Sequence, residues 1–116
     1  MGQRIGHFEI VGKDAIRLQK FYRDMFGWQI SEPMASMGNY ALIDGGSSGL
    51  GGGIGEEMGG GARVTIYVQV PDLHAALDKA ASLGGKVLMP PMDVPGGPRI
   101  AMFADPEGNT TGLMQG

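Results

Sequence analysis

Two residues near the start of the chain, His7 and Glu9, carry side chains that can move protons. Imidazole titrates near neutrality, so a histidine beside a carboxylate suits general acid–base chemistry or recognition of a polar ligand. Both residues lie within residues 4–11, an alternating segment that predicts a strand. Side chains two positions apart on a strand point to one face, so the two groups share a face. The alternative interpretation of His7 is a hydrogen-bonded structural histidine.

A second alternating segment, residues 63–70, predicts another strand of the same kind. Because side chains alternate along a strand, each of these strands has two faces. One face carries Phe8, Ile10, Ile66 and Val68. The other face carries His7, Glu9, Thr65, Tyr67 and Gln69, whose polar and aromatic side chains suit a ligand pocket.

Aromatic and thioether side chains extend this predicted pocket. Trp28 and Tyr40 are interpreted either as core or as pocket wall, whereas residues 21, 22 and 26, all aromatic, are expected in the core under the first helix. The chain has nine methionines, whose flexible side chains fill cores but also suit a site for varied apolar ligands. Met102 is assigned to the pocket on this basis.

Capping signals define the elements that would position these residues. Asp14 predicts the start of a helix that ends before Gly27, and Asp72 predicts a second helix that ends at residues 84–85. Further strands are predicted over 28–33, 39–44, 50–55 and 86–89, the last closed by two prolines. Residues 100–104 and 110–114 predict a closing hairpin around the turn signal Asp-Pro-Glu-Gly.

Residues 45–61 contain ten glycines in seventeen positions. Neither a G-x-G-x-x-G spacing nor a G-K-[ST] motif occurs there, which argues against a nucleotide-phosphate loop. We expect a strand over 50–55, whose glycines allow close backbone approach or widen a cavity, followed by a flexible linker. A mobile lid over a ligand site is the alternative.

The chain repeats its plan with an offset of 58 residues. This offset carries Asp14 onto Asp72 and Gly27 onto Gly85, and likewise residue 30 onto 88 and Pro33 onto Pro91. One helix cap, one helix stop and one strand end therefore coincide. The 116 residues are expected to form a single α+β domain of two tandem βαβββ modules, about 1–60 and 61–116.

Three features together resemble the vicinal oxygen chelate superfamily of glyoxalase I, bleomycin-resistance proteins and extradiol dioxygenases. They are the closing turn Asp105-Pro106-Glu107-Gly108-Asn109, the cluster Phe21-Tyr22 with Phe26-Gly27-Trp28, and the internal duplication, which spans the whole chain. The resemblance implies half-barrel modules that enclose a ligand cavity, with one sheet face under a helix and the other lining the cavity. On this basis the face with Phe8, Ile10, Ile66 and Val68 is expected under the helices. The face with His7, Glu9, Thr65, Tyr67 and Gln69 is expected to line the cavity. The resemblance also implies a homodimer with twofold symmetry.

Metal enzymes of that superfamily take one ligand from the first and last strand of each module. The matching positions here are His7, Thr65, Gly112 and, by the 58-residue offset, Ile54. Only His7 has a ligating side chain. Glu56 lies close to the Ile54 position, so His7 with Glu56 is the alternative metal set, to which Glu9 would add a third ligand.

The resemblance therefore leaves three function classes. The first is a metal-free domain without a cofactor that binds a small, partly apolar or aromatic molecule. The second is an enzyme: a divalent-metal-dependent lyase, isomerase or dioxygenase, or a metal-free catalyst in which His7 and Glu9 exchange protons. The third is an interaction module with a collapsed cavity. The expected pocket residues are His7, Glu9, Trp28, Tyr40, Thr65, Tyr67, Gln69, Met102 and Gly112.

The composition of the chain argues against several classes of partner and of chemistry. A formal net charge of −3 argues against nucleic acid or an anionic membrane surface as a partner. The absence of cysteine excludes disulfides, thiol nucleophiles and thiolate metal sites within this sequence. With no apolar run long enough for a membrane span and no signal-peptide pattern at its start, the chain is expected in the cytoplasm.

Overall fold

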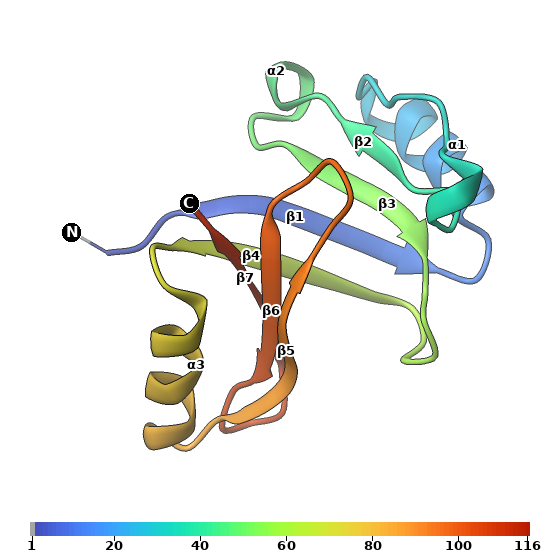
Figure 1. Ribbon diagram of the computed structural model, residues 1–116. Helices are drawn as coiled ribbons and strands as arrows, with labels where there is room; N and C mark the ends of the chain where they lie inside the picture. Colours follow the sequence, from blue (N-terminus) through green and yellow to red (C-terminus); the bar gives the residue numbers. More distant parts are fainter. Residues whose placement is uncertain (1) are drawn as a thin grey trace. The chain divides into compact units, whose positions relative to one another are not determined.

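The computed structural model describes residues 2–116 as a mixed α+β chain that divides into two compact units (Figure 1). The first module comprises His7–Val64. The second module comprises Thr65–Gly116 together with the N-terminal residues through Gly6. No helix within the described residues has the length and apolar character needed to cross a membrane.

The first module contains a three-stranded arrangement in the order β2-β3-β1. Strand β1 runs parallel to β3, with Phe8 opposite Gly52 and Glu9 opposite Gly53, and β2 runs antiparallel to β3. The elements in chain order are β1 (Ile5–Gly12), α1 (Ala15–Phe26), the short 3₁₀ helix η1 (Ala35–Met37), β2 (Ala41–Ile43), α2 (Gly45–Ser48) and β3 (Gly52–Glu56).

Two expectations for this module need correction. Residues 28–33 do not form a strand: Ile30 makes an isolated bridge with Ile43. The glycine-rich segment begins with the short helix α2, which was not expected, before it enters β3. The predicted strand over 50–55 is confirmed with slightly shifted bounds.

Helix α1 begins and ends where its capping residues predict. The carboxylate of Asp14 accepts the backbone N–H of Arg17 at 3.1 Å, and Gly27 takes the left-handed conformation with φ 70° that ends the helix. Leu18 and Tyr22 pack against the core cluster of the module. Phe21 was expected in the core, but 58% of its surface is exposed.

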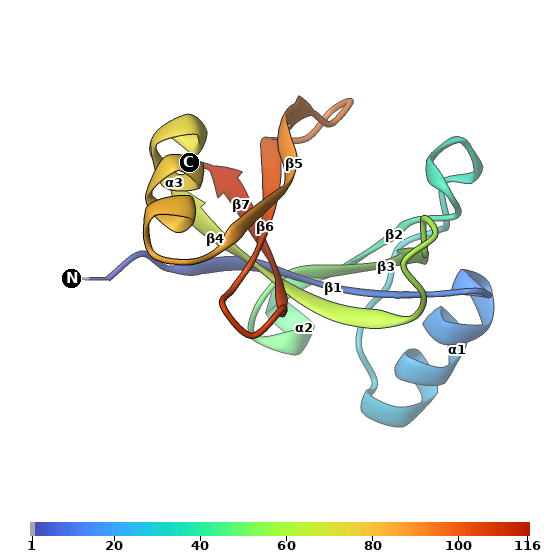
Figure 2. The same ribbon diagram turned by 90° about the horizontal axis from the view of Figure 1, so that it is seen from below.

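The second module is a four-stranded sheet in the order β4-β7-β6-β5. Helix α3 packs along β5, β6 and β7, as Figures 1 and 2 show. Val68 packs against the core under this helix as expected, whereas Ile66 remains 40% exposed. The elements are β4 (Arg63–Val70), α3 (Leu73–Ser82), β5 (Lys86–Asp93), β6 (Arg99–Ala104) and β7 (Thr110–Gln115).

Strand β5 continues through the two prolines that were expected to close it. Its pairing with β6 reaches Asp93, with register shifts between Val87 and Met89 and again between Met89 and Met92. Because β5 lies at the end of the strand order, the amide protons that Pro90 and Pro91 lack are not needed by a further strand.

The predicted closing hairpin is confirmed by the pairing of β6 with β7, which reaches Ala104 and Thr110. Its turn depends on Asp105, whose Oδ1 accepts the backbone N–H groups of Glu107 and Asn109, both at 2.9 Å. Oδ2 accepts the Asn109 side-chain amide at 2.8 Å. These hydrogen bonds, chiefly that from the Asn109 side chain, lower the pKa of Asp105 below its ordinary value.

We expect Asp105→Ala to lower the melting temperature at neutral pH, because the turn loses its acceptors. A carboxyl whose folded-state pKa is lowered contributes stability above its unfolded-state pKa, and this contribution disappears as the pH falls through the folded-state pKa. The difference in melting temperature should therefore be constant at neutral pH and shrink in the acid range. Glu107→Ala, which removes another exposed carboxylate from the same turn, is the control. A difference in melting temperature that stays the same at acidic pH would contradict the role of the Asp105 carboxylate as the acceptor in this turn.

Candidate functional site

The hydroxyl of Tyr40 links the two candidate proton-transfer residues. It donates to Glu9 Oε2 at 3.1 Å, and the same oxygen lies 2.9 Å from His7 Nε2. Tyrosine has one hydroxyl proton, so while that proton points to Glu9, the histidine contact requires Nε2–H to donate to the tyrosine oxygen. The structure thus brings His7, Glu9 and Tyr40 together in one hydrogen-bonded chain.

Tyr40 reaches this position because strand β3 carries glycine beneath it. A Cβ at Gly53 would collide with the Tyr40 hydroxyl and ring, and a Cβ at Gly55 would also collide with the ring. Gly52 likewise leaves room for the ring of Phe8 on the other face of the strand. These glycines therefore accommodate aromatic rings and do not leave an empty cavity, which revises one of the roles expected for them.

A buried amide fixes the backbone next to Tyr40. Gln19, on α1, is only 2% exposed, and its Nε2 donates to the carbonyl oxygens of Asn39 at 2.7 Å and Ile54 at 2.9 Å. Asn39 has a φ of 54°, a conformation that asparagine tolerates better than most residues. Helix α1 thereby holds the segment before β2 against β3, and Tyr40 follows directly. Gln19 and Asn39 could not be singled out from the sequence, because both look like ordinary surface amides.

Burial lowers the pKa of His7 below the ordinary value for histidine, and the negative charge of Glu9 offsets part of this effect. Imidazole is therefore neutral at neutral pH. With Nε2–H directed to Tyr40, Nδ1 is the ring nitrogen with a lone pair that can accept a proton or a hydrogen bond. The site combines a neutral base, a phenol and a carboxylate.

The donor set does not fit the metal site that the resemblance implies. Ile54 is fully buried in the core cluster with Ile10 and Ile43, so it faces the helix side of the sheet. Glu56 lies two residues after Ile54 on β3, so it shares the face of Ile54 and not that of His7. Its carboxylate accepts a hydrogen bond from Asn39 Nδ2 at 2.9 Å. Among residues 2–116 no three His, Asp or Glu side chains gather closely enough to hold a metal ion.

The strand registers also correct the expected equivalence of Ile54 with Gly112. Glu9 pairs with Gly53 in the first module, and Tyr67 pairs with Gly112 in the second. Glu9 and Tyr67 are related by the 58-residue offset, so the true counterpart of Gly112 is Gly53, one residue earlier than the offset alone gives. Both last-strand positions are therefore glycine.

Within the second module, three expected pocket residues lie in one row across neighbouring strands. Tyr67 on β4 pairs with Gly112 on β7, and Gly112 pairs with Met102 on β6. The Tyr67 ring occupies the space that a Cβ at Gly112 would need. Thr65 is buried, and the Gln69 side chain lies against Gly6 and Gly116.

Trp28 occupies a different environment from the other expected pocket residues. It packs against the core cluster of the first module, stacked on Tyr22 with ring centroids 5.7 Å apart and in edge contact with Phe8. Phe8 and Ile10 face this core, whereas Glu9 contacts Tyr40. Trp28 is therefore a core residue on the helix side of the sheet.

Comparison with known proteins identifies the family. The sequence model of the Glyoxalase/Bleomycin resistance protein/Dioxygenase superfamily matches residues 4–113. The chain belongs to this superfamily. The resemblance inferred from the turn, the aromatic cluster and the duplication is thus confirmed, and so is the α+β fold class.

Individual members of the superfamily are moderately similar to this domain. It is 32% identical over 116 residues to a glyoxylase-like domain-containing protein of Didymella fabae, covering 92% of this chain and 89% of that protein. It is 29% identical over 119 residues to the anthracycline biosynthesis protein DnrV of Streptomyces peucetius, covering 87% of this chain. The match spans only 42% of the length of DnrV.

A solved structure shows the same fold at low identity. Methylmalonyl-CoA epimerase from Mycobacterium tuberculosis superposes with a TM-score of 0.70 at 17% identity, over 96% of this chain and 86% of that chain. This likeness supports the superfamily architecture.

We expect Gly53→Ala to destabilise the domain by about 1–3 kcal/mol, because the new methyl group must displace the Tyr40 ring. Gly51→Ala is the matched control, since its Cβ would meet only the Ile43 carbonyl oxygen at 3.9 Å, an ordinary contact. Urea unfolding of both variants measures the difference. Equal stability of the two variants would show that Tyr40 does not require the glycine.

We also expect the His7 ring to titrate below the ordinary histidine range when followed by NMR. Glu9→Gln should lower the pKa of His7 further, because it removes the negative charge that favours imidazolium. A rise in the His7 pKa in this variant would contradict the electrostatic coupling.

Proposed function

We propose that this superfamily domain binds a small, partly apolar or aromatic molecule without a metal ion, on the face of the first module that carries His7, Glu9 and Tyr40. The observation that carries the proposal is the Tyr40 hydroxyl, which lies in hydrogen-bond contact with both His7 and Glu9. The three side chains together offer donors and acceptors beside an aromatic ring. Such a combination suits a ligand with an aromatic body and one or two polar groups.

The residues at the two last-strand positions matched to metal ligands support a metal-free site. Gly53 and Gly112 have no side chain to ligate a metal, and tyrosine rings fill the adjoining space in both modules. His7, the single ligating residue among the four matched positions, contacts Tyr40 through Nε2. The relative named for anthracycline biosynthesis accords with an aromatic ligand.

Metal-free acid–base catalysis is the second candidate, and the hydrogen-bonded chain from His7 to Glu9 favours it. A neutral His7 can accept a proton from a bound substrate at Nδ1, and the charge of Glu9 stabilises the imidazolium that forms. Tyr40 holds the two groups together. In this case the molecule that binds is also converted.

The metal question is tested with protein purified without a histidine tag, by metal analysis and by thermal melts with added Ni²⁺, Zn²⁺, Mn²⁺ or Fe²⁺. We expect no stoichiometric metal and no rise in melting temperature. A rise that His7→Ala abolishes would overturn the metal-free proposal.

Ligand binding is tested by an NMR screen of aromatic compounds that carry hydroxyl or carbonyl groups. For a compound that binds, Tyr40→Phe should weaken affinity by about fivefold, the equivalent of one hydrogen bond of about 1 kcal/mol. Tyr22→Phe, which removes a hydroxyl from the helix side of the sheet, should leave affinity unchanged. Conversion of the compound that stops in His7→Ala would favour the enzyme candidate, and equal effects of the two tyrosine variants would contradict the proposed site.

A further inference from the structure

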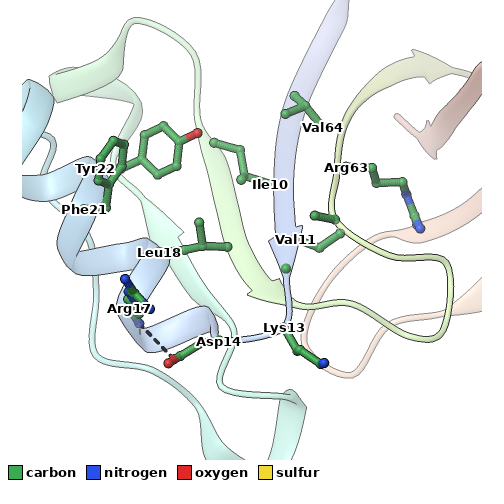
Figure 3. Close-up of a pocket in the computed structure, with 12 residues that line it drawn as sticks. Ile10, Val11, Lys13, Asp14, Arg17, Leu18, Phe21, Tyr22, Arg63 and Val64 are labelled. Atoms are coloured by element: carbon green, nitrogen blue, oxygen red, sulfur yellow. Dashed lines mark hydrogen bonds between the residues drawn. The ribbon is translucent and has the colours of Figure 1, made fainter.

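A groove beside helix α1 lies apart from the proposed site. It has a volume of about 620 Å³ and is lined by α1, the end of β1 and the start of β4, all within the first module (Figure 3). Ile10 and Leu18, which line it, belong to the helix side of the sheet. His7 and Glu9 alternate with Ile10 along β1, so they point to the opposite face.

The walls of the groove are apolar and partly exposed. Leu18, Phe21 and Tyr22 line it from α1, and Val64 lines it from β4. Phe21 is 58% exposed and Val64 66% exposed, although both are large apolar side chains. Concave apolar surface that remains in contact with water is suited to binding an apolar group.

One end of the groove carries an excess of positive charge. In Figure 3, Lys13, Asp14 and Arg17 lie together at this end, while Phe21 and Tyr22 lie farther along α1. The Asp14 carboxylate accepts the backbone N–H of Arg17 as the helix cap. Within residues 2–116, no acidic group lies within ion-pair distance of Lys13 or of the Arg17 side chain.

The charge at this end contrasts with that of the whole chain. Lys13 and Arg17 lie beside one carboxylate in a chain whose net charge is −3, and the N-terminal turn of α1 adds partial positive charge. The local charge is opposite in sign to that of the whole chain, so it selects an anion.

We propose that this groove binds a small carboxylate with an apolar tail. The carboxylate lies at the end formed by Lys13 and Arg17, and the tail extends along Leu18, Phe21 and Val64. The volume falls in the range of roughly 300–1,000 Å³ that is usual for small-molecule sites. Because of this positive charge, we expect the groove to bind the carboxylate more tightly than a neutral compound of the same shape.

The test titrates the full chain with octanoate and with 1-octanol, its neutral counterpart, and follows backbone amides by NMR. We expect octanoate to shift the amides of residues 13–22 and 63–64 and to bind at least about threefold more tightly than 1-octanol. The variant Lys13→Gln/Arg17→Gln should lose about three- to tenfold in octanoate affinity, as expected for two partly exposed charge pairs. Phe21→Ser should weaken the binding of both compounds.

Two controls separate this site from the rest of the protein. Lys20→Gln removes a charge from the same helix that pairs with Asp24 and does not line the groove, so octanoate affinity should stay unchanged. Tyr40→Phe should also leave octanoate binding unchanged, which keeps this test independent of the proposed function.

Three outcomes would overturn the proposal: equal affinity for octanoate and 1-octanol, shifts centred on His7 and Tyr40, or no effect of the Lys13 and Arg17 substitutions. Concentration-dependent broadening of the groove amides, with a dimer in sedimentation that Phe21→Ser dissociates, would assign the groove to a second copy of the chain instead. That result would also overturn it.

Discussion

The arrangement of the first module depends on a steric constraint between one tyrosine ring and a strand. Tyr40 can lie over β3 only where that strand lacks side chains, at Gly53 and Gly55. The position of the ring then determines where its hydroxyl meets His7 and Glu9. Gln19 supports the same arrangement from the helix side, because its amide donates to backbone carbonyls on both segments that flank the ring. Packing, backbone geometry and the polar site are therefore one connected system.

The second module contains a similar contact between a tyrosine ring and a strand glycine, with different residues around it. Tyr67 covers Gly112 as Tyr40 covers Gly53, although Tyr67 lies on β4 and Tyr40 directly precedes β2. In each module an aromatic side chain occupies space at the position where metal enzymes of the superfamily carry a ligand. Replacement of glycine by glutamate at either position would bring a side chain into that ring, so restoring a metal ligand would require the ring to move as well.

The features that the sequence predicted correctly are local. The caps at Asp14 and Asp72, the stop at Gly27 and the closing turn depend on residues within a few positions of each other, so their types reveal them. The joining of Tyr40 to His7 spans 33 residues and was not predictable from spacing. The register of β3 was also not predictable from the sequence. A shift of one residue exchanges Gly53 for Ile54, and the side chains of these two residues point to opposite faces of the sheet. The periodicity of α1 suggested Phe21 as core, but it cannot tell which apolar residues the neighbouring strands cover.

The irregular strand β5 bears on how the protein avoids unwanted association. It is the terminal strand of its sheet, so within residues 2–116 no further strand pairs with its outer edge. Two of its apolar residues, Leu88 and Met92, are 48% and 47% exposed. A regular edge with such residues would be a template for pairing with strands of other chains. Pro90 and Pro91 remove consecutive amide donors, and the register shifts on both sides of Met89 bend the edge. The two prolines and the register shifts therefore make this edge a poor template for pairing with strands of other chains, even though it carries apolar side chains.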